Sequence, residues 1–348
     1  MDVKSLFSRR SFLKMGTLSA LGAAGAAALF RQPEAVAQTP QPPSSTYGAV
    51  MQHGEHSPHM PTLDGEVDHR ANGFDPTTLL TDFDYGTVST LPTGQMLHEY
   101  NFFAADKVIE VAPGINFPAW TYNGRVPGPF IRVREGDRVR INFVNASPHS
   151  HTMHFHGIHA ANQDGVYEVV PTGGRFVYEF DAEPFGLHLY HCHIPPLAKH
   201  IAKGLYGVFI IDPRDGWPNK ADHEFVMVMN GIDIDFDGAN DFYAVNTIPF
   251  YYDKHPIKIK VGELVRIFLV NILEYDPVNS FHLHANFFHY YPTGTSLTPS
   301  EYTDTIIQGQ GQRGIVEFRY KYPGKYMFHA HKTEFAELGW TGVFEVEA

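Results

Sequence analysis

One ten-residue segment occurs twice in this chain of 348 residues, as GDRVRINFVN at 136–145 and as GELVRIFLVN at 262–271. Each begins at a glycine turn and alternates polar with apolar side chains, as a strand with one buried face does. Three more pairs follow in the same order along the two halves: HFH (154–156) with HLH (282–284), GLHLYHCH (186–193) with GKYMFHAH (324–331), and GLYGVFI (204–210) with GWTGVFE (339–345). This ordered repeat predicts two copies of one all-β unit.

The predicted fold is therefore all-β, with two tandem β-sandwich domains at residues 83–215 and 216–348. The composition agrees, because 31 glycines and 25 prolines supply many turns and only 18% of the residues are charged. A formal net charge of -12 argues against binding to nucleic acid or to an anionic membrane surface, since both require a basic face. Small-molecule partners are expected instead.

The N-terminal region has the pattern of an export signal followed by a linker. SRRSFLK at residues 8–14 is a twin-arginine motif, and an apolar run at 16–30 precedes a cleavage site at 35–37. We assign residues 1–37 to a twin-arginine signal peptide, which predicts a periplasmic or extracellular protein without a membrane span in its mature chain. Residues 38–82 are rich in Pro, Ser and His, so we expect an extended arm there.

Histidines occur in four pairs of the form His-x-His. Because side chains alternate along a strand, both imidazoles of such a pair project from one face and can bind metal together. The pairs are His154/His156, His191/His193, His282/His284 and His329/His331, two in each copy of the repeat. Their equivalent positions in a duplicated unit are poorly explained by chance, so we interpret all eight histidines as metal ligands.

The only cysteine, Cys192, stands between the histidines of one pair and cannot form a disulfide within the chain. In the second copy its place is taken by Ala330, while Phe335 and Asn279 stand where the first copy has His200 and His151. Two imidazoles and one thiolate with a weak axial group are typical of a blue copper centre. We therefore expect His151, Cys192 and His200 to bind one copper ion, while the neighbours of Cys192 face a second metal cluster.

From about residue 97 to the C-terminus these motifs resemble the two-domain multicopper oxidases, laccase-like proteins of the cupredoxin superfamily that are related to copper nitrite reductases. The resemblance implies two cupredoxin-like Greek-key domains with the blue site in the first, an arrangement called type B. It also implies about four copper ions per chain. The implied ligands are His151, Cys192 and His200 for the type 1 copper, His154 and His282 for the type 2 copper, and His156, His191, His193, His284, His329 and His331 for the type 3 pair.

The resemblance further implies a homotrimer in which each trinuclear site is shared between the first domain of one subunit and the second domain of the next. It matches Asp164 to the acid that laccases use near the type 2 copper, although an ordinary Asp-Gly turn is the competing interpretation. Leu205 stands where the axial methionine usually falls. Because leucine cannot coordinate, we expect a raised type 1 reduction potential.

These features predict an oxidase that couples one-electron oxidation of phenols or aromatic amines to reduction of O2 to water, with electrons entering through an exposed edge of His200 or His151. A copper nitrite reductase is the main competing candidate, because the spacing from Cys192 to His200 and the pair Pro195-Pro196 resemble that family. By the same resemblance, such enzymes need only three histidines for their second copper and have an Asp at the position of His154. Two further candidates are a metallo-oxidase acting on Cu(I) or Mn(II) and an exported, non-catalytic copper-binding protein.

Overall fold

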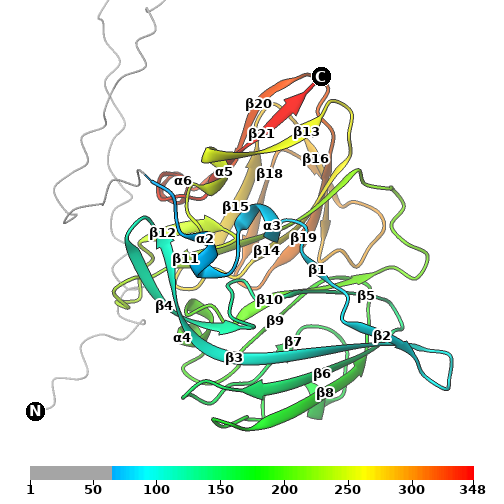
Figure 1. Cartoon of the computed structure of the whole chain (residues 1–348). Helices are drawn as coiled ribbons and strands as arrows, with labels where there is room; N and C mark the ends of the chain where they lie inside the picture. Colours follow the sequence, from blue (N-terminus) through cyan, green and yellow to red (C-terminus); the bar gives the residue numbers. More distant parts are fainter. Residues whose placement is uncertain (1–64) are drawn as a thin grey trace, which may run out of the picture. The chain divides into compact units, whose positions relative to one another are not determined.

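The computed structural model describes residues 65–348, so the predicted signal peptide and residues 38–64 of the predicted arm lie outside the described part. The predicted all-β class is confirmed, since four sheets and a few short helices make up the described chain (Figure 1). No helix among the described residues is long and apolar enough to cross a membrane.

The first half of the chain forms two facing sheets. One has the order β2-β3-β6-β8, with β4 also paired to β3, and the other has the order β1-β5-β10-β9-β7. The strands are β1 (Phe83–Asp84), β2 (Thr87–Thr90), β3 (Met96–Ala112), β4 (Ile115–Tyr122), β5 (Phe130–Arg134), β6 (Arg138–Asn145), β7 (His154–Phe155), β8 (Arg175–Asp181), β9 (Gly186–His191) and β10 (Tyr206–Asp212). Two short helices accompany them, η2 (Ala161–Gln163) and α4 (Leu197–Ala202).

The second half forms two further sheets, with the orders β12-β11-β14-β19-β16-β17 and β13-β21-β20-β15-β18. The strands are β11 (His223–Ile232), β12 (Phe242–Val245), β13 (His255–Lys260), β14 (Val265–Asn271), β15 (Val278–Leu283), β16 (Phe288–Pro292), β17 (Glu301–Thr303), β18 (Thr305–Gly309), β19 (Arg313–Phe318), β20 (Gly324–His329) and β21 (Thr341–Glu347). The helices are α5 (Tyr251–Lys254) and α6 (Thr333–Glu337).

The duplicated segments are β6 and β14, and each pairs in parallel with the strand that precedes it in its sheet order. In β6 the side chains of Val139, Ile141 and Phe143 are buried in the core of the first sandwich, whereas Arg140 and Asn142 between them are partly exposed. All seven residues of β14 are buried, because its sheet is covered on both faces. The alternation in the sequence therefore predicts the pleat correctly for β6 and understates the burial of β14.

The two halves share a continuous apolar core. The strand β10 sends Phe209 and Ile211 into the core of the first sandwich and Val208 and Ile210 into a second core that also contains the strands of the second half. The sheet containing β10 is thus buried on both faces. The four sheets stack in one sequence of layers from β8 to β21 (Figure 1).

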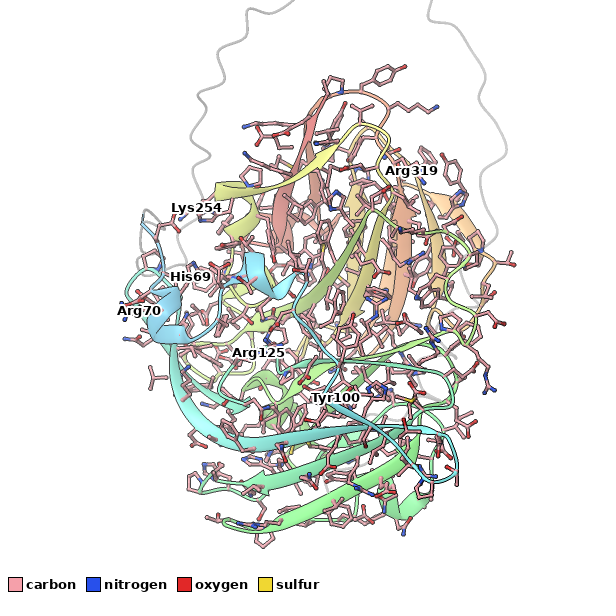
Figure 2. The ribbon with its side chains drawn as sticks, turned by 45° about the vertical axis from the view of Figure 1, so that its right-hand side comes forward. His69, Arg70, Tyr100, Arg125, Lys254 and Arg319 are labelled. Carbon is pink, nitrogen blue, oxygen red and sulfur yellow. The ribbon has the colours of Figure 1, made fainter. Side chains whose placement is uncertain are left out.

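The segment just before β1 is folded and not extended. It contains α2 (His69–Asn72) and α3 (Pro76–Leu79), whose N-caps Asp68 and Asp75 accept hydrogen bonds from backbone N–H groups. Figure 2 labels His69, whose ring lies edge-on to Tyr251 of α5 at 5.3 Å. The apolar side chains Val67, Phe74, Leu79 and Leu80 are buried in the second core. Our expectation of an extended arm is therefore corrected for residues 65–82, because the apolar side chains of this segment pack into the second core.

Candidate metal centres

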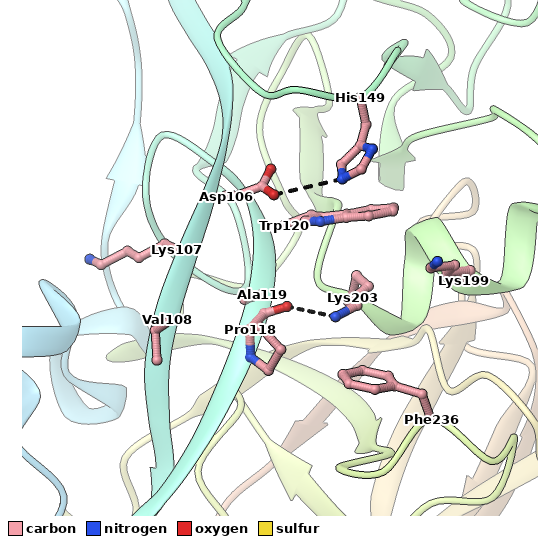
Figure 3. Close-up of a pocket in the computed structure, with 10 residues that line it drawn as sticks. All are labelled: Asp106, Lys107, Val108, Pro118, Ala119, Trp120, His149, Lys199, Lys203 and Phe236. Carbon is pink, nitrogen blue, oxygen red and sulfur yellow. Dashed lines mark hydrogen bonds and ion pairs between the residues drawn. The ribbon is translucent and has the colours of Figure 1, made fainter.

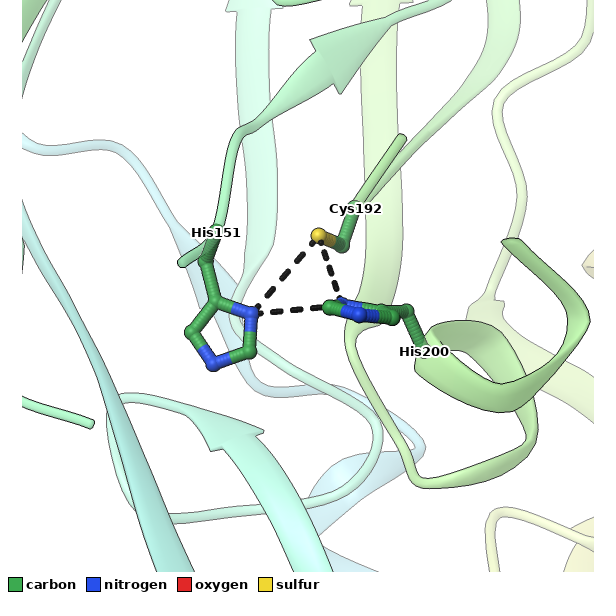
Figure 4. Close-up of side chains that lie close together, drawn as sticks. All are labelled: His151, Cys192 and His200. Carbon is green, nitrogen blue, oxygen red and sulfur yellow. Dashed lines mark hydrogen bonds between the residues drawn. The ribbon is translucent and has the colours of Figure 1, made fainter. Parts of the chain in front are cut away.

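The predicted ligands Cys192, His200 and His151 lie together. Cys192 directly follows β9, His200 belongs to α4, and His151 lies between β6 and β7. The Cys192 Sγ lies 3.2 Å from His200 Nδ1 and 3.8 Å from His151 Nδ1, and the two Nδ1 atoms are 3.3 Å apart (Figure 4). One sulfur and two ring nitrogens thus converge, as a trigonal Cys-His-His copper site requires.

Burial prepares this cluster for a metal ion. The exposed fractions are 0% for His151 and Cys192 and 4% for His200. Burial lowers the pKa of His151 to about 3 and the pKa of His200 to about 4, so both rings are neutral at pH 7 and can donate a lone pair to a metal. Burial also raises the pKa of the Cys192 thiol, so that a thiolate here needs a bound cation. The donor set therefore fits copper.

The same burial corrects one expectation. We expected electrons to enter through an exposed edge of His200 or His151, but His151 is fully buried and His200 is only 4% exposed. The indole of Trp120 lies against both, with ring centroids 4.8 Å from His200 and 5.5 Å from His151. Sequence reasoning missed Trp120, because it lies on β4, far along the chain from every ligand motif.

The second copy keeps the backbone of this site and replaces its side chains. The Cys192 N–H donates to the Leu205 carbonyl at 3.0 Å, and the Leu205 N–H donates to the His200 carbonyl at 3.3 Å. The matching bonds in the second copy are Ala330 N–H to the Trp340 carbonyl at 3.2 Å and Trp340 N–H to the Phe335 carbonyl at 2.8 Å. Alanine, phenylalanine and tryptophan provide no metal ligand, so this type of site is built in the first copy alone.

Four predicted ligands form a cluster in the first half. Pairing of β7 with β9 sets His154 opposite His191. Their partners His156 and His193 lie just beyond the ends of these strands, and the rings of both contact the ring of His154. The Nε2 atoms of His156 and His191 lie 3.3 Å apart, and the rings of His154 and His193 lie 5.1 Å apart. Hydrogen bonds of Nδ1 orient two of these rings. His154 Nδ1 donates to the Asp164 carbonyl at 2.8 Å, and His191 Nδ1 donates to the Cys192 carbonyl at 2.9 Å. This fixes Nε2 as the free ligand atom of those two rings.

The second half repeats this geometry. Pairing of β15 with β20 sets His282 opposite His329, whose rings lie 5.3 Å apart. The Nε2 atoms of His284 and His329 are 2.9 Å apart, and the rings of His282 and His331 are 5.2 Å apart. His282 Nδ1 donates to the Asp304 carbonyl and His329 Nδ1 to the Ala330 carbonyl, at 2.9 Å and 2.6 Å. The two clusters are therefore equivalent in contacts as well as in sequence.

A hydroxyl supports the same position in each cluster. The backbone N–H of His193 donates to Thr152 Oγ1 at 3.0 Å, and the backbone N–H of His331 donates to Ser280 Oγ at 2.8 Å. These hydroxyls hold the second histidine of the pairs His191/His193 and His329/His331. The sequence analysis did not select either residue, although Thr152 stands two positions before the pair His154/His156 and Ser280 stands two positions before the pair His282/His284.

The two clusters are distinct groups within one chain. Among the described residues, no group of at least three neighbouring ligand atoms combines histidines of the first cluster with histidines of the second. In the second cluster His284 and His331 are exposed, whereas His191 of the first cluster is buried. The second cluster therefore opens on the surface of the subunit.

Asp164 lies beside the first cluster, as its place in the sequence suggested. Its Oδ1 is 3.2 Å from His154 Nδ1 and 2.9 Å from His159 Nε2. His159, which belongs to none of the four His-x-His pairs, thus binds the carboxylate directly. Asp164 is thus held in place by one ring while it contacts a second ring that belongs to the cluster.

The fold and these three groups of ligands define a copper protein with cupredoxin-like sandwiches. Family models described as multicopper oxidase match residues 105–216 and 226–348. A crystal structure of a multicopper oxidase is 61% identical and superposes with a TM-score of 0.79, covering 81% of this chain and 100% of that chain. The chain belongs to the multicopper oxidase family.

Copper nitrite reductases are also similar. The enzyme of Nitrosomonas europaea superposes with a TM-score of 0.67 at 30% identity, covering 72% of this chain and 94% of that chain. The copper-containing nitrite reductase of Neisseria meningitidis is 32% identical over 251 residues, which cover 65% of this chain and 63% of the relative. The chain thus spans slightly less than two thirds of that curated relative. This likeness confirms the predicted relation to nitrite reductases.

Proposed function

We propose that this protein is a laccase-like oxidase that couples one-electron oxidation of phenols or aromatic amines to the four-electron reduction of O2 to water. One observation carries the proposal: three histidines in each half bring their ligand atoms close together, and the fourth, His193 or His331, contacts the same group through its ring, so the eight imidazoles that the family resemblance implies are present. A nitrite reductase would leave part of this set without a role.

The copper assignment follows the position of each ligand. His151, Cys192 and His200 bind the type 1 copper; His154 and His282 bind the type 2 copper; and His156, His191, His193, His284, His329 and His331 bind the type 3 pair. When bound, these metals supply the one-electron steps and the reduction of O2. Leu205, fully buried next to Cys192, leaves the type 1 site without a coordinating axial side chain.

Asp164 is the residue that handles protons in this proposal. Its carboxylate lies within hydrogen-bond distance of two rings and is partly exposed, so it can take a proton from water and hold it beside the cluster. The reduction of one O2 to two waters consumes four protons. His159 acts on Asp164 by fixing the carboxylate through its Nε2 atom.

A homotrimer is the proposed assembly, in which the first cluster of one subunit meets the second cluster of the next. Two observations support it: the clusters are distinct groups within the chain, and the second cluster is exposed. A head-to-tail interface closes into a ring and would bury both. Light scattering on the copper-loaded protein tests this, and a monomer with full O2 reduction would contradict it.

Copper content is the decisive experiment for the function. Metal analysis of the fully loaded protein should give about four copper ions per chain, and the protein should consume O2 when a phenol is supplied. About two copper ions per chain with nitrite reduction would favour the second candidate, which the 30% to 32% identity with copper nitrite reductases supports.

A variant of the second cluster sharpens that test. His284→Gln removes one exposed imidazole of the cluster, so we expect it to lower copper content and O2 consumption while the blue absorption of the type 1 site stays. His289→Gln is the matched control, because His289 is an exposed histidine of the same half that belongs to neither cluster. Equal O2 consumption by His284→Gln and wild type would contradict the oxidase assignment.

We also propose export by the twin-arginine pathway to the periplasm or the cell exterior, from the motif at residues 8–14. Replacing Arg9 and Arg10 by lysine should retain the protein inside the cell, as fractionation would detect.

A further inference from the structure

A pocket lies directly outside the Cys-His-His site. It has a volume of about 590 Å³ and is bounded by β3, β4, α4 and the loop that carries Phe236 (Figure 3). This volume falls within the usual range for small-molecule sites. The residues that matter for its chemistry are Asp106, Trp120, His149, Lys199, Lys203 and Phe236.

Trp120 is the wall between this pocket and the buried ligands. It lines the pocket, is only 8% exposed, and lies edge-on to the rings of His200 and His151. Its backbone N–H donates to the Lys203 carbonyl at 2.8 Å, which ties β4 to the end of α4. A molecule in the pocket can contact the indole, and the indole contacts His200. This is the shortest route that the described contacts offer from the pocket to the site.

The side chains of the pocket suit a planar ring. Trp120 and His149 have ring centroids 4.5 Å apart, and Phe236 lies across the pocket from them (Figure 3). Phe236 is 49% exposed and has a φ of 62°, a left-handed conformation that a bulky residue rarely adopts. These aromatic faces can bind an aromatic ligand by stacking or edge contacts.

The charges of the pocket suit an anion. Among the described residues, neither Lys199 nor Lys203 has a carboxylate partner in an ion pair: the Lys203 amine donates to the Pro118 carbonyl at 2.8 Å and lies 3.7 Å from the Phe236 ring centre, and the Lys199 amine lies 5.5 Å from Trp120. The lining carboxylate, Asp106, is already bound by the Ser147 hydroxyl at 2.6 Å and faces His149 at 3.8 Å. Neither ammonium group is thus held in a direct ion pair, although the charges of Asp106 and Asp233 act on Lys203 at longer range.

We propose that this pocket receives the reductant, and that the reductant is a phenol carrying a carboxylate, with its ring against Trp120 and its carboxylate at Lys199 and Lys203. The proposal rests on the proposed oxidase function and specifies its substrate class. Each phenol would lose one electron through the contact of Trp120 with His200, reducing a copper ion held by His151, Cys192 and His200 from Cu(II) to Cu(I), and would release its hydroxyl proton to solvent to become a phenoxyl radical. Four such steps supply the electrons for one O2.

The test compares two phenols with the same ring, sinapic acid and its methyl ester, which differ by the negative charge and one methyl group, under anaerobic conditions. The measured quantity is the second-order rate constant for loss of the blue absorption. Lys199→Gln should lower the rate with sinapate about fivefold, the usual size of an exposed charge interaction, and should leave the rate with the ester unchanged. Lys258→Gln is the matched control, because it removes one exposed charge from β13 outside the pocket.

A second variant and a binding measurement test the remaining parts. Trp120→Leu should slow reduction by both phenols at least about tenfold, while the copper content and the blue spectrum stay as in wild type. Calorimetry on the reduced holoprotein, which cannot accept an electron, should show weaker binding of sinapate to Lys199→Gln than to wild type.

Equal effects of Lys199→Gln on sinapate and its ester, or unchanged binding, would overturn the proposal. Unchanged rates in Trp120→Leu would overturn the role of the indole. Failure of the pocket proposal can be distinguished from failure of the oxidase function. A protein that accepts electrons from phenols but consumes no O2 would disprove the oxidase function and leave the pocket proposal in place.

Discussion

Arg132 of β5 and Glu224 of β11 form an ion pair across two sheets, with Arg132 Nη1 2.7 Å from Glu224 Oε2. The arginine also binds Asp212, and Glu224 is shared with Arg266, which binds Glu317 in turn. Burial by itself would raise the pKa of Glu224, but the hydrogen bonds and charges of the two arginines outweigh it and lower that pKa. Glu224 thus bridges two arginines, whose side chains are only 8% and 2% exposed and each of which also pairs with a carboxylate of its own.

Glu224→Gln should therefore destabilise the fold. Asp212 and Glu317 still pair with the two largely buried guanidinium groups, but each guanidinium loses its charged hydrogen bond to Glu224. We expect a cost of about 2 kcal/mol, since the carboxylate is 24% exposed. Thermal unfolding at fixed protein concentration measures the loss. The control is Glu345→Gln, because the pair of Glu345 with Lys325 is at the surface and should contribute little. Equal unfolding temperatures of Glu224→Gln and wild type would contradict this prediction.

The copper-free protein should lose stability as the pH falls below about 6.5. Burial lowers the pKa of His156 to about 2, of His151 to about 3, and of His188, His191 and His200 to about 4, each from an ordinary value of 6.5. The unfolded chain then binds protons that the folded chain does not, so the stability present above pH 6.5 decreases towards the folded pKa values. Each such histidine contributes about 1.4 kcal/mol per pH unit within that window.

Denaturant unfolding of the copper-free protein at a series of pH values measures this slope. His188→Gln should reduce it by about one proton, while the exposed His289→Gln should not change it. An unfolding free energy that is constant between pH 6.5 and pH 4.5 would show that these rings are not buried as neutral groups.

Leu205→Met should lower the type 1 reduction potential. Leu205 is fully buried beside Cys192, and a thioether at this position can supply the axial ligand that stabilises Cu(II) relative to Cu(I). Potentiometric titration of the blue band gives the potential directly. Leu205→Val, which changes the side chain without adding a donor, separates coordination from packing. A potential that is unchanged or higher in Leu205→Met would count against an axial effect.

Asp164→Asn should slow O2 reduction about a hundredfold and leave the blue spectrum unchanged, because it removes an ionisable group beside His154 but touches no ligand of the Cys-His-His site. O2 consumption compared with the absorption of the blue site separates the two effects. Asp215→Asn, a carboxylate elsewhere in the first half, is the control. If turnover is unchanged, Asp164 belongs to an ordinary turn and has no part in the proton supply.

The repeat and the histidine spacing predicted the all-β class and the family, and they selected the residues that the structure brings together. The selection rested on the period of two in side-chain direction along a strand, and the structure places the first histidine of each pair in a strand and the second just beyond the end of that strand. The sequence also predicted that the second copy lacks the ligands of the Cys-His-His site. The backbone hydrogen bonds of Ala330 and Trp340 place these residues where the first copy has Cys192 and Leu205.

The tertiary structure alone decided what surrounds the ligands. Three contacts join residues that are distant along the chain or turned towards each other by loops. They are the packing of Trp120 against His151 and His200, the binding of Asp164 by His159, and the packing of residues 65–82 into the second core. The local sequence determines the direction of a side chain along its strand. Which strand, loop or helix arrives next to it depends on how the sheets stack, and that is fixed only when all four layers bury their apolar faces together.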